Sequence, residues 1–137
     1  MRIFIDTNVL IDMAVARNDN HKAADVIMKS CVVRKNEGFV SSHSVTDIFY
    51  IVRKDLMPEE KRNWVKYIVN NLTILTEDKE AFLSALADEG FFDLEDNLQM
   101  VCAAEADLDF IVTQNVRDFV QSQVPAVSIP EFAAQYC

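Results

Sequence analysis

The feature of this chain that most restricts its fold is the alternation of short apolar runs with longer segments of helical periodicity. Short apolar runs at residues 2–5, 39–42, 72–75 and 110–113, with a fifth at 124–128, are predicted to be strands. Between them, apolar residues recur every three or four positions, as in residues 21–35 and 94–106. No two neighbouring runs resemble a hairpin. This order predicts a three-layer α/β/α sandwich around a mostly parallel sheet of four or five strands.

Length and composition are those of one globular domain spanning residues 1–137, because half of the residues are hydrophobic and about a quarter are charged. The three cysteines and two histidines lack zinc-ligand spacing and do not indicate a disulfide framework. No apolar run approaches the roughly 20 residues that a membrane span needs. An acid at Asp6 also interrupts any N-terminal signal sequence. We therefore expect a cytoplasmic protein with no membrane association.

Four aspartates fall where a parallel sheet places its ligands, outside the carboxyl ends of the strands. Asp6 follows the first strand directly, and Asp118 lies five residues after the strand at 110–113. Asp47 is predicted in the first turn of a helix that Ser44 opens with a pattern resembling a capping box. Asp96 is predicted in the first turn of the helix that leads into the strand at 110–113. We expect these four carboxylates to meet at one edge of the sheet.

Four converging carboxylates repel one another and require a counter-charge, for which a divalent cation is the natural candidate. Ligation by oxygen alone favours Mg²⁺ or Mn²⁺ over zinc. Such a site suits hydrolysis of phosphodiester bonds, because a bound metal lowers the pKa of a water and neutralises charge on the phosphate. Hydroxyl and amide side chains near the strand ends are candidates to orient ligands or substrate: Thr7, Ser42, Thr113 and Asn115.

The net charge of −9 argues against general nucleic-acid binding over the whole surface. Bound metal would mask part of that charge and leave local basic segments to hold a nucleic acid. Basic residues cluster in sequence on two adjacent predicted helices, and we take them as candidate contacts to the phosphate backbone: Arg53, Lys54, Lys61, Arg62 and Lys66. A solvated basic surface without such a role is the more common reason for a cluster of this kind.

Four segments resemble the motifs of the PIN-domain family, in the family's order and spacing. Residues 5–12 (IDTNVLID) are similar to its opening motif, and residues 44–47 (SVTD) to its second. Residues 93–99 (DLEDNLQ) and 112–119 (VTQNVRDF) resemble the third and the last. Any one of these motifs is a weak signal, whereas four in order over most of the chain are a strong one.

The resemblance implies a Rossmann-like sandwich with Mg²⁺- or Mn²⁺-dependent endoribonuclease activity, with Asp6, Asp47, Asp96 and Asp118 as metal ligands and Asn8 in support. Many small bacterial members are VapC-type toxins, so an RNA substrate, an antitoxin partner and a homodimer are implied as well. Two positions depart from the family's pattern. Many members have Glu at the place of Asp47, and some have a further acid at the place of Asn115.

Each acid also has a simpler structural explanation. Asp6 is a favoured residue for capping a helix, and Asp93 is expected to cap the helix that carries Asp96. We therefore place Asp93 and Glu95 outside the set of ligands. His43 is isolated in the sequence, and its position alone indicates no role as a base.

Two other classes of protein fit the sequence less well. A haloacid-dehalogenase-like phosphatase needs a second Asp two residues after the first, where this chain has Asn8. A receiver-like domain needs a Lys after a later strand, and none follows residues 111–113. A catalytically weak PIN-like domain that binds RNA or protein stays open as an alternative, because Asp47 replaces the usual Glu.

Overall fold

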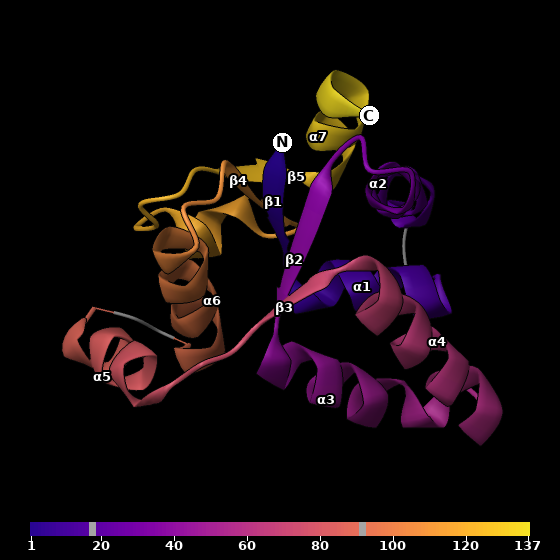
Figure 1. The fold of residues 1–137 in the computed structure, drawn as a ribbon, viewed down its shortest axis with the longest axis horizontal. Coiled ribbons are helices and arrows are strands. Elements are labelled where there is room, and N and C mark those ends of the chain that lie inside the picture. Colours follow the sequence, from indigo (N-terminus) through magenta and orange to yellow (C-terminus); the bar gives the residue numbers. More distant parts are fainter. Residues whose placement is uncertain (17–18, 91–92) are drawn as a thin grey trace.

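A five-stranded parallel sheet forms the centre of the computed structural model, which describes residues 1–16, 19–90 and 93–137. The strands are β1 (Arg2–Ile5), β2 (Glu37–Ser41), β3 (Thr73–Leu75), β4 (Phe110–Thr113) and β5 (Ala126–Ser128). Their order across the sheet is β3-β2-β1-β4-β5, and each neighbouring pair is parallel (Figure 1). The predicted class of fold is confirmed, including the number of strands.

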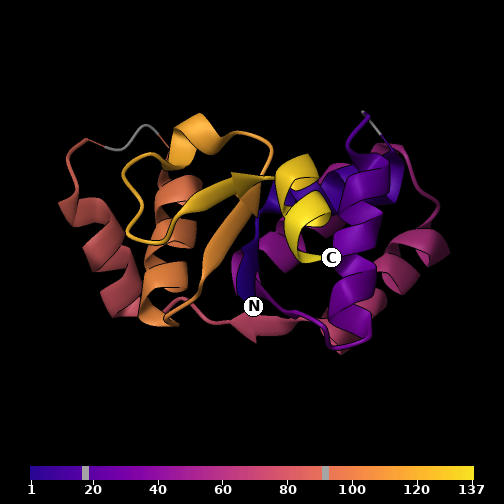
Figure 2. The same ribbon diagram turned by 90° about the horizontal axis from the view of Figure 1, so that it is seen from above.

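Helices cover both faces of this sheet (Figures 1 and 2). One face is packed by α1 (Thr7–Val15), α2 (His21–Val32), α3 (Ser42–Ile51), α4 (Pro58–Asn71) and α7 (Ile129–Tyr136). The other is packed by α6 (Leu94–Glu105), against which α5 (Lys79–Ala87) lies. Two short 3₁₀ helices, η1 (Val52–Lys54) and η2 (Val116–Phe119), complete the described elements. Among the described residues, no helix is long and apolar enough to cross a membrane.

The two cores follow from the alternation of side chains along each strand. In β1, Ile3 and Ile5 point into the larger core with α1 and α2, whereas Phe4 points into the smaller core beneath α6. The same division holds for Val112 and Ile111 in β4. Strands that are apolar on both faces are buried on both faces, as parallel sheets require.

The order of the strands determines where a ligand can bind. The chain moves outward from β1 to β2 and β3, then crosses back to β4 and β5 on the other side of β1. The direction therefore reverses between β1 and β4. In open parallel sheets, the crevice outside the carboxyl ends of the strands at such a reversal is the usual binding site.

The start of α3 differs from the prediction. The helix begins at Ser42, so Ser44 lies inside it and Asp47 lies in its second turn. The Ser44 hydroxyl is buried and makes hydrogen bonds of 2.6 Å with the hydroxyls of Thr7 and Ser41. Because Ser41 and not Ser44 occupies the capping position of this helix, the predicted capping box was wrong.

Candidate metal centre

Asp6 leaves the carboxyl end of β1 and caps α1. Its side chain accepts a hydrogen bond from the backbone N–H of Asn8 at 3.4 Å and another from Thr113 Oγ1 at 2.8 Å. The residue is only 2% exposed. Burial raises the pKa of Asp6, partly offset by hydrogen bonds from Thr113, Asn8 and Gln99, and the charge of Glu95 raises it further. The capping role is therefore real, and it coexists with a place in a negatively charged site.

Asp96 lies in the first turn of α6, close to two of the other predicted ligands. Burial and the charges of Asp6, Asp93, Asp118 and Glu95 raise the pKa of Asp96 to about 7. Asp96 and Asp118 also line the same cavity of about 500 Å³. Asp118 is carried by η2, after the end of β4, and is exposed. The structure thus brings Asp6 and Asp118 within electrostatic range of Asp96.

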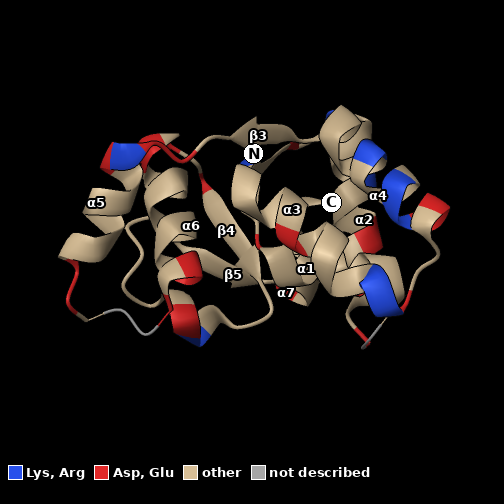
Figure 3. Cartoon of the chain, turned by 90° about the horizontal axis from the view of Figure 1, so that it is seen from below, with Lys and Arg blue, Asp and Glu red and all other residues tan. Residues whose placement is uncertain are grey.

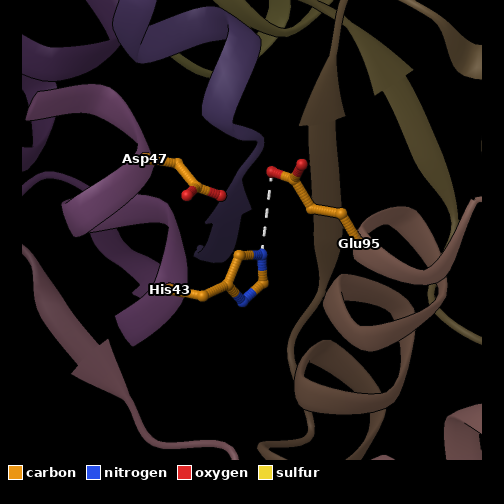
Figure 4. A group of neighbouring side chains, drawn as sticks. All are labelled: His43, Asp47 and Glu95. Carbon is orange, nitrogen blue, oxygen red and sulfur yellow. Dashed lines mark ion pairs between the residues drawn. The ribbon is translucent and has the colours of Figure 1, made fainter. Parts of the chain in front are cut away.

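Asp47 belongs to a second group, with His43 and Glu95 (Figure 4). One ligand atom from each of these three side chains lies within 4.8 Å of the other two. His43 and Asp47 are four residues apart on α3, so they project from the same face of that helix. Glu95 comes from the first turn of α6, in the opposite layer. The two layers therefore meet at this group.

Glu95 connects the two groups. Its carboxylate accepts a hydrogen bond from Thr7 Oγ1 at 2.9 Å and forms an ion pair with His43 Nε2 at 3.6 Å. The interaction with His43 lowers the pKa of Glu95, burial opposes the shift, and Thr7 assists it. The charge of Glu95 in turn raises the pKa of both Asp6 and Asp96. Glu95 was predicted to lie outside the set of ligands, and the structure directs its side chain toward Thr7 and His43, beside the predicted acids.

His43 is also part of the site. Its Nδ1 pairs with the carboxylate of Glu77, two residues beyond the end of β3. Burial lowers the pKa of His43, but Glu95 and Glu77 outweigh it, so the pKa is raised overall. Two sequence signals could have found these residues: the spacing of His43 from Asp47, and the position of Glu77 at a strand's carboxyl end.

Most of the predicted supporting residues make contacts within the site. Thr113 binds Asp6, Thr7 binds Glu95 and Ser44, and Ser42 binds Glu77. Asn8 contributes its backbone N–H and is exposed, and Asn115, also exposed, donates its N–H to Thr113 Oγ1 at 3.1 Å. Asp93 caps α6 as predicted, accepting from the N–H groups of Glu95 and Asp96 at 2.8 and 3.1 Å.

The predicted basic residues lie away from these acids. Arg53 and Lys54 are in η1, beyond the far end of α3, and Lys61, Arg62 and Lys66 are on α4. Lys and Arg lie along α4 after the two acids of its first turn, and Asp and Glu are found at the start of α6 (Figure 3). Arg53 stacks on the Tyr50 ring at 3.7 Å from its centroid. Lys61 lies 4.9 Å from the centroid of Phe49, so part of the basic surface has aromatic neighbours.

A parallel α/β sandwich with carboxylates gathered outside the ends of its strands defines a candidate divalent-metal protein of the α/β class. The chain belongs to the PIN-domain family, whose model matches residues 2–117. It is 27% identical to Ribonuclease VapC1 of Aquifex aeolicus over 139 aligned residues. The alignment covers 98% of this chain and 95% of that protein.

Solved structures share the fold at lower identity. The VapBC2 structure from Rickettsia felis, bound to a promoter DNA fragment, matches with a TM-score of 0.70 at 16% identity, covering 93% of this chain and 98% of that one. DNA-bound VapBC from Salmonella typhimurium also gives 0.70, at 20% identity, covering 94% and 98%. Mycobacterium tuberculosis VapC20, described as a sarcin-ricin loop cleaving toxin, gives 0.64 at 11% identity, covering 80% and 86%.

Proposed function

We propose that this protein is a divalent-metal-dependent endoribonuclease that hydrolyses RNA at the carboxyl edge of the sheet, with Asp6, Asp47, Asp96 and Asp118 as its catalytic acids. One observation carries the proposal: Asp96 is partly buried among acids, and burial together with the charges of Asp6, Asp93, Asp118 and Glu95 raises the pKa of Asp96 to about 7. A bound cation would relieve that repulsion. The similarity to a protein named as a ribonuclease supports RNA as the substrate.

Oxygen donors fit Mg²⁺ or Mn²⁺ at Asp6, Asp96 and Asp118. When bound, such a cation supplies an activated water and a counter-charge for the scissile phosphate. Thr113 holds the Asp6 carboxylate in place through its 2.8 Å hydrogen bond, and Asp93 anchors the turn that carries Asp96. Basic residues on η1 and α4 would contact the RNA backbone at phosphates distant from the cleaved bond: Arg53, Lys54, Lys61, Arg62 and Lys66.

We also propose that the protein is the toxin of a toxin–antitoxin pair and forms a homodimer. Solved neighbours that are complexes named VapBC support an antitoxin partner. Several large apolar side chains are exposed in two segments of the chain, which suits burial against other chains. They are found where α3 leads into α4 and on α5: Phe49, Tyr50, Met57, Phe82, Leu83 and Leu86.

Cleavage of an end-labelled RNA tests the nuclease proposal. We expect the purified protein to cut with Mg²⁺ or Mn²⁺ and to stop when a chelator is added. Asp6→Asn and Asp96→Asn should each lose more than about 100-fold in rate, because even partners outside the ligand shell cost 10- to 100-fold. Glu131→Gln, which removes an exposed acid on α7, is the matched control and should cut normally.

Two results would contradict the proposal. Equal cleavage by the parent, Asp6→Asn and Asp96→Asn would exclude these acids from the reaction. Binding of RNA with no cleavage under any metal would instead support the alternative of a catalytically weak PIN-like binding domain. The position of Asp47, grouped with His43 and Glu95 apart from Asp6, is the observation that keeps this alternative under test.

A further inference from the structure

The ring of His43 is held in one orientation by the contact of its Nδ1 atom with Glu77. Nδ1 pairs with Glu77, whose side chain is only 4% exposed. Glu77 also accepts from Ser42 Oγ and, at 3.5 Å, from the backbone N–H of His43. These three donors come from the first turn of α3 and hold the Glu77 carboxylate in place. The opposite ring nitrogen, Nε2, is therefore directed toward Glu95 and Asp47 (Figure 4).

The Nε2 atom of His43 is buried and has no hydrogen-bond partner among the described residues. Its contact with Glu95 Oε1 is 3.6 Å long, which is beyond hydrogen-bond distance. The ion pair with Glu95 is thus the polar contact that Nε2 makes, and a buried polar atom without a hydrogen bond calls for an explanation, such as an ion that the atom binds. Histidines that bind metals characteristically give their other ring N–H to a carboxylate, which orients the ring. The pair of Glu77 and His43 has this arrangement.

Two oxygen donors complete the set. Asp47 lies one turn beyond His43 on α3, and Glu95 reaches in from α6, with one ligand atom from each of the three residues within 4.8 Å of the others. Thr7 Oγ1 holds Glu95 by a 2.9 Å hydrogen bond. We propose that His43, Asp47 and Glu95 bind a divalent cation of their own, beside the position formed by Asp6, Asp96 and Asp118.

The chemistry of these donors predicts which ions the site selects. Imidazole nitrogen is a poor ligand for Mg²⁺ and a good one for first-row transition metals, while carboxylates accept both. The site of His43, Asp47 and Glu95 therefore binds Mn²⁺ or a later first-row ion in preference to Mg²⁺. The inference rests on the proposed function in that it adds a neighbouring cation to the same pocket, although its test needs no RNA.

Pulsed electron paramagnetic resonance of the Mn²⁺-loaded protein tests the site, using Mn²⁺ alone as the probe. We expect nitrogen modulation from a directly bound imidazole in the parent, and a changed pattern when histidine is labelled with ¹⁵N. His43→Gln should remove the signal. His21→Gln is the matched control, because His21 is the chain's other histidine and contacts the backbone of Asp12, outside this group. It should keep the signal.

The variant Glu77→Gln tests whether Glu77 orients His43 without itself binding the ion. The variant should keep the nitrogen signal but bind Mn²⁺ at this site about 10- to 100-fold more weakly, the usual effect of losing a partner behind a ligand. A parent that binds Mn²⁺ without nitrogen modulation, or that binds no Mn²⁺, would overturn the inference, as would a signal that survives in His43→Gln. The labelled parent gives this answer even if His43→Gln does not fold.

Cleavage of RNA with Mg²⁺, measured on the same preparations, separates the two proposals. Cleavage by a parent that lacks the nitrogen signal would overturn only the second metal site. A nitrogen signal in a parent that never cleaves RNA would overturn only the proposed nuclease function.

Discussion

Asp96 is the residue at which the electrostatic cost of the site is most evident. Its pKa of about 7 reflects burial and the neighbouring charges of Asp6, Asp93, Asp118 and Glu95. A carboxyl group in the unfolded chain has a pKa near 4. The folded, metal-free protein therefore holds this group in an environment that favours its protonated form, and folding and protonation are linked.

The metal-free protein should become less stable as the pH rises from 5.5 to 8. A group with a raised pKa stabilises the fold fully below its unfolded pKa and loses that contribution as the pH passes its folded pKa. Asp96 acts in this way up to about pH 7, and the raised pKa of His43 acts in the same direction. Glu77 and Glu95 have lowered pKa values, so their stabilisation is lost only at more acidic pH.

Urea unfolding at pH 5.5 and pH 8, after removal of metal, measures this effect. In Asp96→Asn the loss of unfolding free energy between the two pH values should be smaller, by on the order of 1 kcal/mol after allowance for solvent screening. Glu131→Gln should behave like the parent. An unchanged pH dependence in Asp96→Asn would show that burial and the neighbouring charges do not raise the pKa of Asp96.

Some residues of the site can be predicted from the sequence, and others cannot for a geometric reason. Asp6 could be placed because it directly follows a strand, and Asp93 because a cap has a local signature. Glu95 was missed because adjacent helical residues point about 100° apart, and the rotation of α6 against the sheet is a tertiary property. His43 and Glu77 contact each other across 34 residues, which no local pattern reports.

The start of α6 is the element on which the site depends most. Asp93 caps this helix through the N–H groups of Glu95 and Asp96, the two residues that face the pocket. A helix N-terminus also carries partial positive charge, which suits the acids gathered there. The cap therefore supports both the helix and the positions of the two candidate ligands.

Removing this cap should affect both stability and activity. Asp93→Ala is expected to lose about 1 kcal/mol of unfolding free energy and to cleave RNA more slowly, since its first turn is no longer held. Asp93→Ser keeps a capping oxygen without the charge and should retain most of both. Denaturant unfolding and RNA cleavage, measured together, check these expectations.

Glu60→Ala provides the control on another helix. Glu60 accepts from the backbone N–H of Met57 at 2.7 Å at the start of α4, away from the acids. The variant should be similarly destabilised but should cleave RNA at the parent's rate. A loss of activity equal to that of Asp93→Ala would mean that stability alone explains the effect of removing the cap.

The predicted elements matched the structure where local signals were strong. The strand at 110–113 was placed to the residue, because apolar residues are bounded by polar ones on both sides. The second strand was predicted to begin at 39, yet β2 begins at Glu37, whose N–H donates to the carbonyl of Met1 at 2.8 Å. Pairing with β1 extends the strand through Gly38, where local propensity predicts a turn.

At the scale of the whole molecule, the sheet gathers residues from most of the sequence into one place. Asp6 follows β1, His43 follows β2, Glu77 follows β3, and Thr113 ends β4. Parallel strands bring their carboxyl ends to the same edge, so residues more than 100 positions apart contact directly, as Thr113 and Asp6 do. The net charge of −9 is thus partly explained by a concentration of acids at one edge.

Whether this edge of the sheet binds metal can be tested by anomalous scattering from crystals of the Mn²⁺-loaded protein. We expect a manganese peak within coordination distance of carboxylate oxygens of Asp6, Asp96 and Asp118. Crystals of protein that cleaves RNA with Mn²⁺, yet show no manganese at these carboxylates, would contradict it.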